Sequence, residues 1–330
     1  MAVKISTISV LILSLALLSF GHCCYGQLRV GFYSTKCPNV ENIVSKVVRE
    51  AFIKDSSIAP AMIRLYFHDC FSNGCDASLL LDGTSSEKKA SPNLSVRGYE
   101  LIDDIKSAVE QECDRVVSCA DIIALATRDL VTLASGGKTR YEIPTGRLDG
   151  KVSLALLVDL PSPRMTVSQT AAKFAERKLS VTDMVLLLGG HTIGVAHCSF
   201  VMDRLYNFQN TQQPDPSMDP KLVQELRLKC PKDSSTDGII NLDQNFTSSN
   251  TVDVSFYKQI NFHRGILHID QQLAIDGMTS KMVTDIANGN DFLARFGQAM
   301  VNLGSVRVIS KAKDGEIRKS CRSCNNPSCV

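Results

Sequence analysis

The sequence has 330 residues, of which 44% are hydrophobic and 21% are charged, an ordinary composition for a folded protein. This length suffices for one large domain or for two lobes. The formal net charge of +2, without any run of lysine and arginine, excludes a general electrostatic attraction to nucleic acid.

The N-terminal segment, residues 1–26, has the pattern of a signal peptide. Lys4 supplies a positive charge, an apolar run extends over 8–20, and the small residues Cys24 and Gly26 precede a cleavage site before Gln27. The run is too short for a good membrane span, and no later segment reaches the necessary length. We therefore expect a secreted mature chain, residues 27–330.

Ten cysteines remain in this mature chain, and an even number in an exported protein indicates disulfides. Proximity suggests only one pair, Cys70–Cys75. Cys321 and Cys324 form an isolated C-x-x-C, which is weak evidence for zinc because no second such pair completes a knuckle.

Apolar periodicity predicts a mainly α fold. Helical patterns extend over 39–54, 59–71, 99–112, 118–134, 167–178, 180–188, 220–229, 254–264 and 281–303. The helix over 118–134 is strongly apolar, which suggests a central position, and Gly136 and Gly137 would end it. Alternating patterns are nearly absent, with 138–143 and 306–309 as the two candidate strands. The irregular stretch over 137–166 could connect two lobes.

The first candidate chemistry lies between Ala61 and Ser78. Arg64 and His68 are four residues apart and therefore share one face of the predicted helix. A neutral imidazole can take up and return a proton near neutral pH, while a neighbouring guanidinium lowers its pKa and stabilises developing negative charge. The structural alternative is an arginine–carboxylate pair that happens to lie near a histidine.

Oxygen-bearing side chains follow this pair. Asp69, Asp76, Ser78 and Glu87, with Gly74 between them, could supply part of the about six to eight oxygens around Ca²⁺, although their spacing is not that of an EF-hand. A second oxygen-rich stretch contains Asp243, Thr247, Ser248, Thr251 and Asp253. Taken alone, this second cluster is more typical of a loop.

His191 follows Gly189 and Gly190 at the end of an apolar helix, where the glycines would admit a flat or bulky group. The histidine is either a metal ligand or a helix-terminus contact. Asp270 is either a carboxylate that orients a ligating imidazole or a local cap. Two glycosylation sequons begin at Asn93 and Asn245.

Together these motifs strongly resemble the secreted plant haem peroxidases (class III). The likeness runs through Arg64-Leu-Tyr-Phe-His-Asp-Cys70, residues 73–78, 91–98 and 117–122, Gly189-Gly-His-Thr-Ile-Gly194, residues 315–318 and Cys321. It implies an all-α fold in which a distal lobe, roughly residues 27–160, and a proximal lobe, roughly residues 161–321, enclose haem b. A short cysteine-containing tail, residues 322–330, follows.

On the distal side, the resemblance assigns His68 as the acid/base that deprotonates H₂O₂ and protonates the leaving oxygen. Arg64 then stabilises charge as the O–O bond breaks, and Phe67 packs over the haem edge. Asn93 holds the distal imidazole through a hydrogen bond, which makes it a poor glycan site and leaves Asn245 as the expected one.

On the proximal side, the resemblance assigns His191 as the haem-iron ligand, made more basic by Asp270. Pro161 matches a residue at the donor-binding edge. The implied activity is reduction of H₂O₂ with one-electron oxidation of phenolic or similar small donors. The implied setting is a monomer in the cell wall or the vacuole, without nucleic-acid or membrane partners.

The resemblance also implies two calcium ions and four disulfides. The first calcium set is Asp69, Ser72, Gly74, Asp76, Ser78 and Glu87. The second is Thr192, Asp243, Thr251, Asp253 and either Thr247 or Ser248. The disulfides are Cys37–Cys113, Cys70–Cys75, Cys119–Cys321 and Cys198–Cys230.

Four features depart from the family pattern. The segment over 243–253 is longer than usual, and the one between Asp149 and Pro161 is shorter, with Leu148 in place of a common second arginine. Tyr141 stands where family members usually carry tryptophan. Cys324 and Cys329 lie beyond the four bridges, so they could form a fifth or link to another molecule. The first two departures concern donor access and one calcium site rather than peroxide chemistry.

Two other classes of protein remain open, a secreted calcium-binding structural protein and a metal hydrolase. Intact Arg64, His68, Asn93, His191 and Asp270 argue against the first, and the lack of an H-E-x-x-H pair argues against the second. The signal peptide disfavours an intracellular haem peroxidase. The sequence leaves the physiological donor open, among lignin precursors, wall proteins and auxin.

Overall fold

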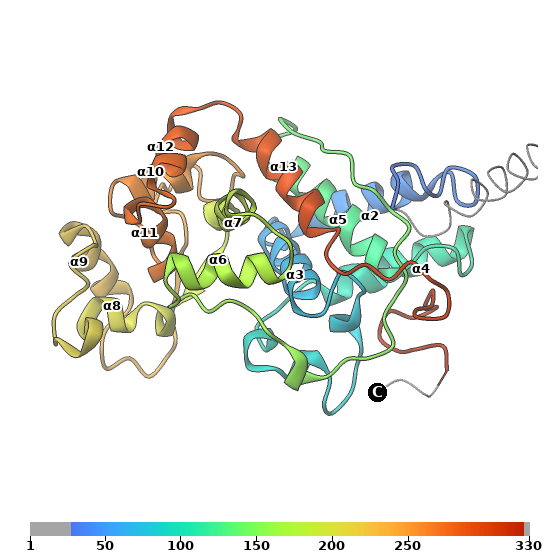
Figure 1. The fold of residues 1–330 in the computed structure, drawn as a ribbon, viewed down its shortest axis with the longest axis horizontal. Helices are drawn as coiled ribbons and strands as arrows, with labels where there is room; N and C mark the ends of the chain where they lie inside the picture. Colours follow the sequence, from blue (N-terminus) through green and yellow to red (C-terminus); the bar gives the residue numbers. More distant parts are fainter. Residues whose placement is uncertain (1–27, 327–330) are drawn as a thin grey trace, which may run out of the picture.

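The computed structural model describes residues 28–326 and is mainly helical, as predicted (Figure 1). Its α-helices are α2 (Val40–Lys54), α3 (Ile58–Ser72), α4 (Tyr99–Glu112), α5 (Cys119–Ala134), α6 (Val167–Glu176), α7 (Val181–Leu188), α8 (Met202–Tyr206), α9 (Pro220–Lys229), α10 (Ser255–Asn261), α11 (His268–Ile275), α12 (Ser280–Asn288) and α13 (Phe292–Leu303). Two short strands, β1 (Val195–His197) and β2 (Ile239–Asn241), pair antiparallel, with Ala196 opposite Ile240.

The structure corrects three details of the predicted elements. The pattern over 281–303 forms two helices, because the backbone of Gly289 is extended and ends α12. Neither 138–143 nor 306–309 forms a strand, since no neighbouring strand lies beside them; the sheet pairs β1 with β2 instead. The helices α8 and α11 were not predicted, because they are too short to show an apolar period.

The helix α5 is the core of the N-terminal half, and 14 of its 16 residues are buried. Helices α2, α3 and α4 pack around it. The Asp149 carboxylate accepts hydrogen bonds from the N–H groups of Cys119 and Ala120, which places an anion at the positive end of the helix. Gly136 and Gly137, both with positive φ, end the helix as predicted.

A buried ion pair joins α5 to the irregular segment after it. Arg147 donates to Asp121 at 2.7 Å, and both side chains are fully buried. The Arg147 guanidinium also donates to the carbonyl of Gly304, directly after α13. One arginine therefore fastens the end of α13 to the centre of the N-terminal helices.

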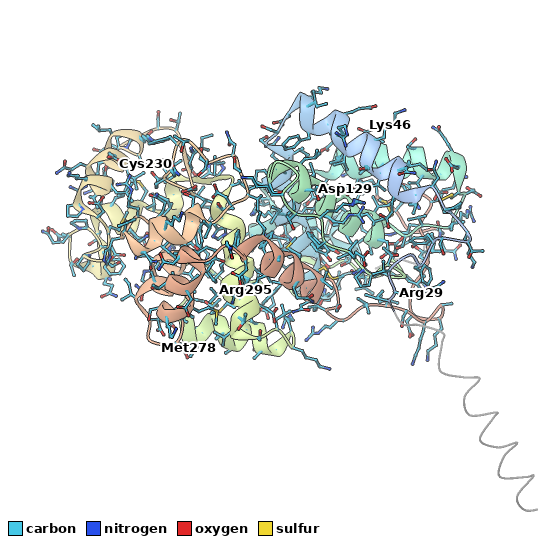
Figure 2. The ribbon with its side chains drawn as sticks, turned by 90° about the horizontal axis from the view of Figure 1, so that it is seen from above. Arg29, Lys46, Asp129, Cys230, Met278 and Arg295 are labelled. Carbon is cyan, nitrogen blue, oxygen red and sulfur yellow. A yellow bond between two sulfur atoms is a disulfide. The ribbon has the colours of Figure 1, made fainter. Side chains whose placement is uncertain are left out.

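The helices from α6 to α12 form a second group beside the first, and α13 joins the two. Figure 2 shows Arg295, on α13, between Cys230 in one group and Asp129 in the other. Helix α13 packs against α7 and against α3. The connection between α5 and α6 is irregular except for the short 3₁₀-helix η4 (Ala155–Leu157).

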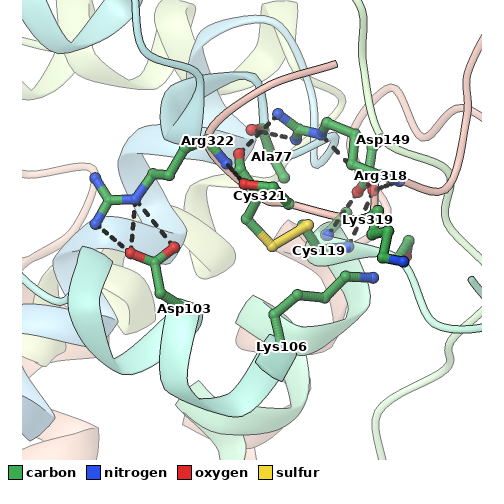
Figure 3. The surroundings of a disulfide bond; sticks show 12 residues. Ala77, Asp103, Lys106, Cys119, Asp149, Arg318, Lys319, Cys321 and Arg322 are labelled. Carbon is green, nitrogen blue, oxygen red and sulfur yellow. Dashed lines mark hydrogen bonds and ion pairs between the residues drawn. A yellow bond between two sulfur atoms is a disulfide. The ribbon is translucent and has the colours of Figure 1, made fainter. Parts of the chain in front are cut away.

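The C-terminal segment returns to the N-terminal helices (Figure 3). Cys321 is bonded to Cys119 at the start of α5, and the Arg318 guanidinium donates to the carbonyl of Ala77. Arg322 forms an ion pair with Asp103 on α4. The last described residues therefore brace the segment that follows the Cys70–Cys75 loop.

The four disulfides are those implied by the resemblance: Cys37–Cys113, Cys70–Cys75, Cys119–Cys321 and Cys198–Cys230. Cys324 is disulfide-bonded as well. Cys329 and the predicted signal peptide lie outside the described residues. Within residues 28–326, no helix has the length and apolar character needed to cross a membrane.

Replacing Asp121 with asparagine tests the buried ion pair. The change leaves the Arg147 charge buried without a counter-charge, so we expect the free energy of unfolding to fall by about 3–5 kcal/mol. Asp285→Asn, which breaks the exposed pair with Lys281, is the matched control and should cost less than about 1 kcal/mol. Denaturant titration measures the free energy of unfolding of both variants. An equal decrease in the two would contradict a special contribution of the buried pair.

Candidate active site

Helix α3 carries the first candidate residues. Its buried face, including Met62 and Leu65, packs against α5, where Thr127 donates to the Met62 carbonyl. Arg64 and Phe67 remain half-buried on another face, and His68 is 9% exposed. Because the apolar residues of the helix face α5, Arg64 and His68 lie together on a face that points away from this core.

Asn93 fixes the protonation pattern of His68. Its Nδ2 donates to the backbone carbonyl of Glu87 at 2.8 Å, so its Oδ1 is the atom that faces His68 Nδ1 at 2.7 Å. Because Oδ1 can only accept, Nδ1 carries the proton and Nε2 is left with a lone pair. Asn93 is only 2% exposed, which agrees with the expectation that it is not a glycan site.

Arg64 is held by the same short segment. Its guanidinium donates to the carbonyl of Pro92 at 2.8 Å, next to Asn93. Burial and the positive charge of Arg64 lower the pKa of His68 to about 3, although the hydrogen bond to Asn93 acts in the opposite direction. His68 is therefore a neutral base at neutral pH.

The second histidine follows α7. A capping box of Ser180 and Asp183 starts this helix, and the 3₁₀-helix η5 (Gly189–Thr192) continues it through His191. His191 Nδ1 lies 2.9 Å from Asp270 Oδ1 in the first turn of α11. Burial would lower the pKa of His191, but the charge and hydrogen bond of Asp270 outweigh it and raise the pKa.

The two histidines share one electrostatic neighbour. The charge of Arg64 lowers the pKa of His68 and opposes the rise in the pKa of His191. The His191 side chain is 29% exposed although Asp270 is buried. His68 offers a free Nε2, and His191 offers an imidazole that is supported by a carboxylate. These two side chains fit a haem bound between them.

The sequence suggested that the glycines before His191 make room for a flat or bulky group, but the side chains beside them belong to the protein. A Cβ at Gly189 would overlap the hydroxyl of Tyr257, which is fully buried and donates to the Val185 carbonyl. A Cβ at Gly190 would lie 3.3 Å from Ile63 on α3. The space at Gly189 is therefore filled by protein side chains rather than by a ligand.

The first calcium set converges after α3. Asp69, Asp76 and Glu87 are all buried, and burial together with mutual repulsion raises the pKa of Asp69 well above its usual value. Burial, with the Asp76 charge adding to it, raises the pKa of Glu87 to about 7. Buried carboxylates that repel one another favour a bound cation, whose remaining ligands would be hydroxyl and carbonyl oxygens.

Unpartnered oxygens support the same interpretation. The hydroxyl of Ser78 and Oε2 of Glu87 are buried without a hydrogen-bond partner. Ser72 is buried too, and its hydroxyl donates to the His68 carbonyl. Gly74 has a φ of +131°, and a Cβ there would lie 2.6 Å from the Arg307 carbonyl, so the turn requires glycine.

The second set is only partly assembled. Thr192 donates to Asp253, and Ser248 donates to Asp243. The hydroxyl of Thr247 is instead turned to Asn245, which favours Ser248 over Thr247. Thr251 is half-buried in the same turn, where its N–H donates to the Ser248 carbonyl.

Sequence reasoning missed Ser255 in this second set. Its hydroxyl donates to Asp243 and its N–H to Asp253, so it joins both carboxylates. Its place two residues after Asp253 was the available signal. Within residues 28–326, no three His, Cys, Asp or Glu side chains are placed to hold a metal by themselves, so each set also needs hydroxyl or carbonyl oxygens.

The predicted donor edge lies beside a surface groove. Pro161 is half-buried, and the residues directly after it line a groove of about 260 Å³ together with residues of the turn after β1: Ser162, Pro163, Arg164, Ser199 and Phe200. This volume is below the roughly 300–1,000 Å³ of pockets for drug-sized ligands, so it suits a single-ring molecule. Ser199 and Phe200 carry no sequence signal, because they belong to the 3₁₀-helix η6 (Cys198–Phe200), which is too short to show an apolar period.

Comparison with known proteins gives consistent matches. A family model described as Peroxidase matches residues 44–289. The chain is 87% identical to Peroxidase 60 of Arabidopsis thaliana over 100% of both proteins. It is 49% identical to Peroxidase 57 of the same plant, over 91% of this chain and 94% of that protein. It is 42% identical to Peroxidase 5 of Vitis vinifera, over 91% and 92%.

Proposed function

The chain belongs to the class III plant peroxidases, and we propose that His68 and His191 divide the reaction with H₂O₂ between them. The enzyme is a haem peroxidase that couples reduction of H₂O₂ to one-electron oxidation of small donors. The observation that supports the division is the contrast between the imidazoles. Burial and the Arg64 charge keep His68 neutral, with Asn93 fixing its tautomer, whereas Asp270 makes His191 more basic.

His191 would hold haem b through Nε2, because Asp270 occupies Nδ1. When bound, the haem supplies the redox-active iron at which the O–O bond of H₂O₂ is broken. Asp270 is 1% exposed and accepts from His191, so it fixes the ring and increases its basicity. The half-buried ring of Phe67, stacked on Phe71 at 4.8 Å, would pack against the haem edge.

The distal residues move the proton. His68 Nε2 accepts a proton from H₂O₂ and returns it to the oxygen that leaves as water. Asn93 keeps Nδ1 protonated throughout, so that Nε2 is the only nitrogen available for the transfer. Arg64 stabilises the negative charge that develops on the leaving oxygen. Its bond to the Pro92 carbonyl keeps the guanidinium beside His68.

Two Ca²⁺ ions would occupy the oxygen-rich sets. The first would use side chains of Asp69, Asp76, Ser78 and Glu87, with carbonyls from Ser72 and Gly74. The second would use Thr192, Asp243, Ser248, Thr251 and Asp253. Each set begins at the residue after a histidine of the active site, Asp69 or Thr192, so each ion would stabilise the backbone that carries an imidazole.

The donors we propose are phenols or similar single-ring reductants, bound at Pro161 and in the adjoining groove. The exposed ring of Phe200 offers an apolar surface, and the polar Ser162 lines the same groove. We further propose a secreted monomer, in the cell wall or the vacuole, glycosylated at Asn245. This asparagine is half-buried next to an exposed Phe246 and Thr247.

Replacing His68 with alanine tests the proton transfer. The reaction of the haem-loaded enzyme with H₂O₂ should slow by a factor of about 10²–10⁴, while the Soret band persists because His191 is intact. Stopped-flow spectroscopy measures the rate. His197→Ala, at an exposed histidine beside Asp237, is the control and should leave it unchanged. An undiminished rate in His68→Ala would refute the assignment.

Removal of calcium tests the two sets. A ligand that binds only the folded protein, at about 100 times its Kd, stabilises it by about 2.7 kcal/mol. A chelator should therefore lower the melting temperature and reduce activity, and excess Ca²⁺ should restore both. Calorimetry with and without chelator makes the comparison, and superimposable melting curves would count against calcium at either set.

A further inference from the structure

The donor edge lies in a short segment that receives little support from its own backbone. We call residues 159–163 the access segment. Among the described residues, neither Leu160 nor Pro161 forms a backbone hydrogen bond. The preceding 3₁₀-helix η4 has no buried residue, and Leu156 within it is 80% exposed. Leu160 packs against the hydrophobic core, but η4 offers no buried side chain that would hold the start of the segment.

Charged contacts hold the first end of the access segment. Lys173 on α6 donates to both carboxylate oxygens of Asp159, at 2.7 and 2.8 Å. Arg177, just after α6, donates to the Asp159 carboxylate at 3.1 Å and to its backbone carbonyl at 3.3 Å. Two cations therefore bind one carboxylate, two residues before Pro161.

Arg177 extends this anchor to the helix that carries His68. Its side chain is 4% exposed, and its Nε donates to the carbonyl of Phe71 on α3 at 2.7 Å. The guanidinium carbon lies 5.2 Å from the centre of the Phe71 ring, which stacks on Phe67. One buried arginine thus connects the access segment with the distal side of the active site.

A backbone hydrogen bond holds the other end. The N–H of Ile269 donates to the carbonyl of Pro163 at 3.0 Å. Ile269 precedes Asp270, the residue that supports His191. The access segment therefore spans from the helix of His68 to the helix of Asp270, with Pro161 between its two attachments.

We propose that Asp159, Lys173 and Arg177 are positioning residues for donor oxidation. They hold Pro161, together with Ser162 and Pro163 in the groove wall, in position. They would affect donor binding only through these residues and would not contact the donor. The inference rests on the proposed donor site at Pro161. A loosened segment should weaken donor binding, while proton transfer at His68, which depends on Asn93 and Arg64, continues.

Kinetics of the haem-loaded enzyme separate these two steps. Asp159→Asn keeps the shape of the side chain but removes one of the two carboxylate charges that Lys173 and Arg177 bind, the other being that of Glu176. We expect the KM for guaiacol, a single-ring phenolic probe, to rise about three- to tenfold. The stopped-flow rate constant with H₂O₂ should stay within about twofold of the unmodified enzyme. Lys173→Met removes one of the two cations and should have a smaller effect in the same direction.

Conservative and remote variants provide the controls. Arg177→Lys keeps the charge but loses the planar fork that reaches Asp159 and Phe71 together, so it should fall between Asp159→Asn and the unmodified enzyme. Asp285→Asn and Lys281→Met make the same chemical changes in an exposed pair on α12 and should alter neither step. If Asp159→Asn does not retain haem, Lys173→Met and Arg177→Lys decide the question.

Two results would overturn the inference. One is an unchanged KM for guaiacol in all three anchor variants. The other is a parallel loss of the H₂O₂ rate, which would indicate general disturbance rather than positioning. Pro161→Ala distinguishes this failure from that of the proposed donor site. If Pro161→Ala raises the KM and the anchor variants do not, only the anchoring is wrong; if Pro161→Ala has no effect, the donor site itself is wrong.

Discussion

Mutual repulsion among Asp69, Asp76 and Glu87 is the constraint on which the active site depends. Unit charges at close range in a poorly solvated interior repel strongly, and the Arg318 charge compensates only part of this repulsion, at Asp76. A bound calcium ion would convert the remaining repulsion into attraction. Asp69 is adjacent to His68, and the Glu87 carbonyl orients Asn93, so the same ion would determine both the position and the protonation of the distal imidazole.

On the proximal side, an oxygen-rich set again lies next to a histidine, but the position of the ring depends less on that set. Thr192 follows His191 as Asp69 follows His68, and it contacts Asp253 of the second oxygen-rich set. There, however, Ser248 and Ser255 already donate to Asp243, so hydroxyl dipoles compensate part of the negative charge. The ring of His191 depends instead on Asp270, which comes from a separate helix. The proposed distal base would thus depend mainly on the proposed cation site, and the proposed proximal ligand mainly on its direct carboxylate contact.

Features that depend on residues close together in the sequence could be predicted from it, whereas contacts between distant residues could not. The long helices α4 and α5 were predicted because their apolar period is local, and Arg64 and His68 share a face for the same reason. The contact of His191 with Asp270 spans 79 residues, and helix α11, which carries Asp270, has only eight residues and no side-chain cap. The sequence pattern therefore left Asp270 open between a partner of an imidazole and a local cap, and the family resemblance favoured the first. Side-chain orientation was equally hidden: only the structure turns Thr247 to Asn245 and leaves Ser248 to Asp243.

Peroxide and the donor would therefore bind to parts of the protein that differ in burial and in the number of contacts that hold them. Peroxide would meet His68, whose partner Asn93 is buried and bonded on both sides. The donor would meet an access segment whose anchor Asp159 is 46% exposed and whose neighbours include solvent-exposed leucines. Changes in length or charge between Asp149 and Pro161 can alter the second region without reaching the first. We expect this segment to be shorter here than in most members of the family, and such a change would bear on the proposed donor site while leaving the proton-transfer residues in place.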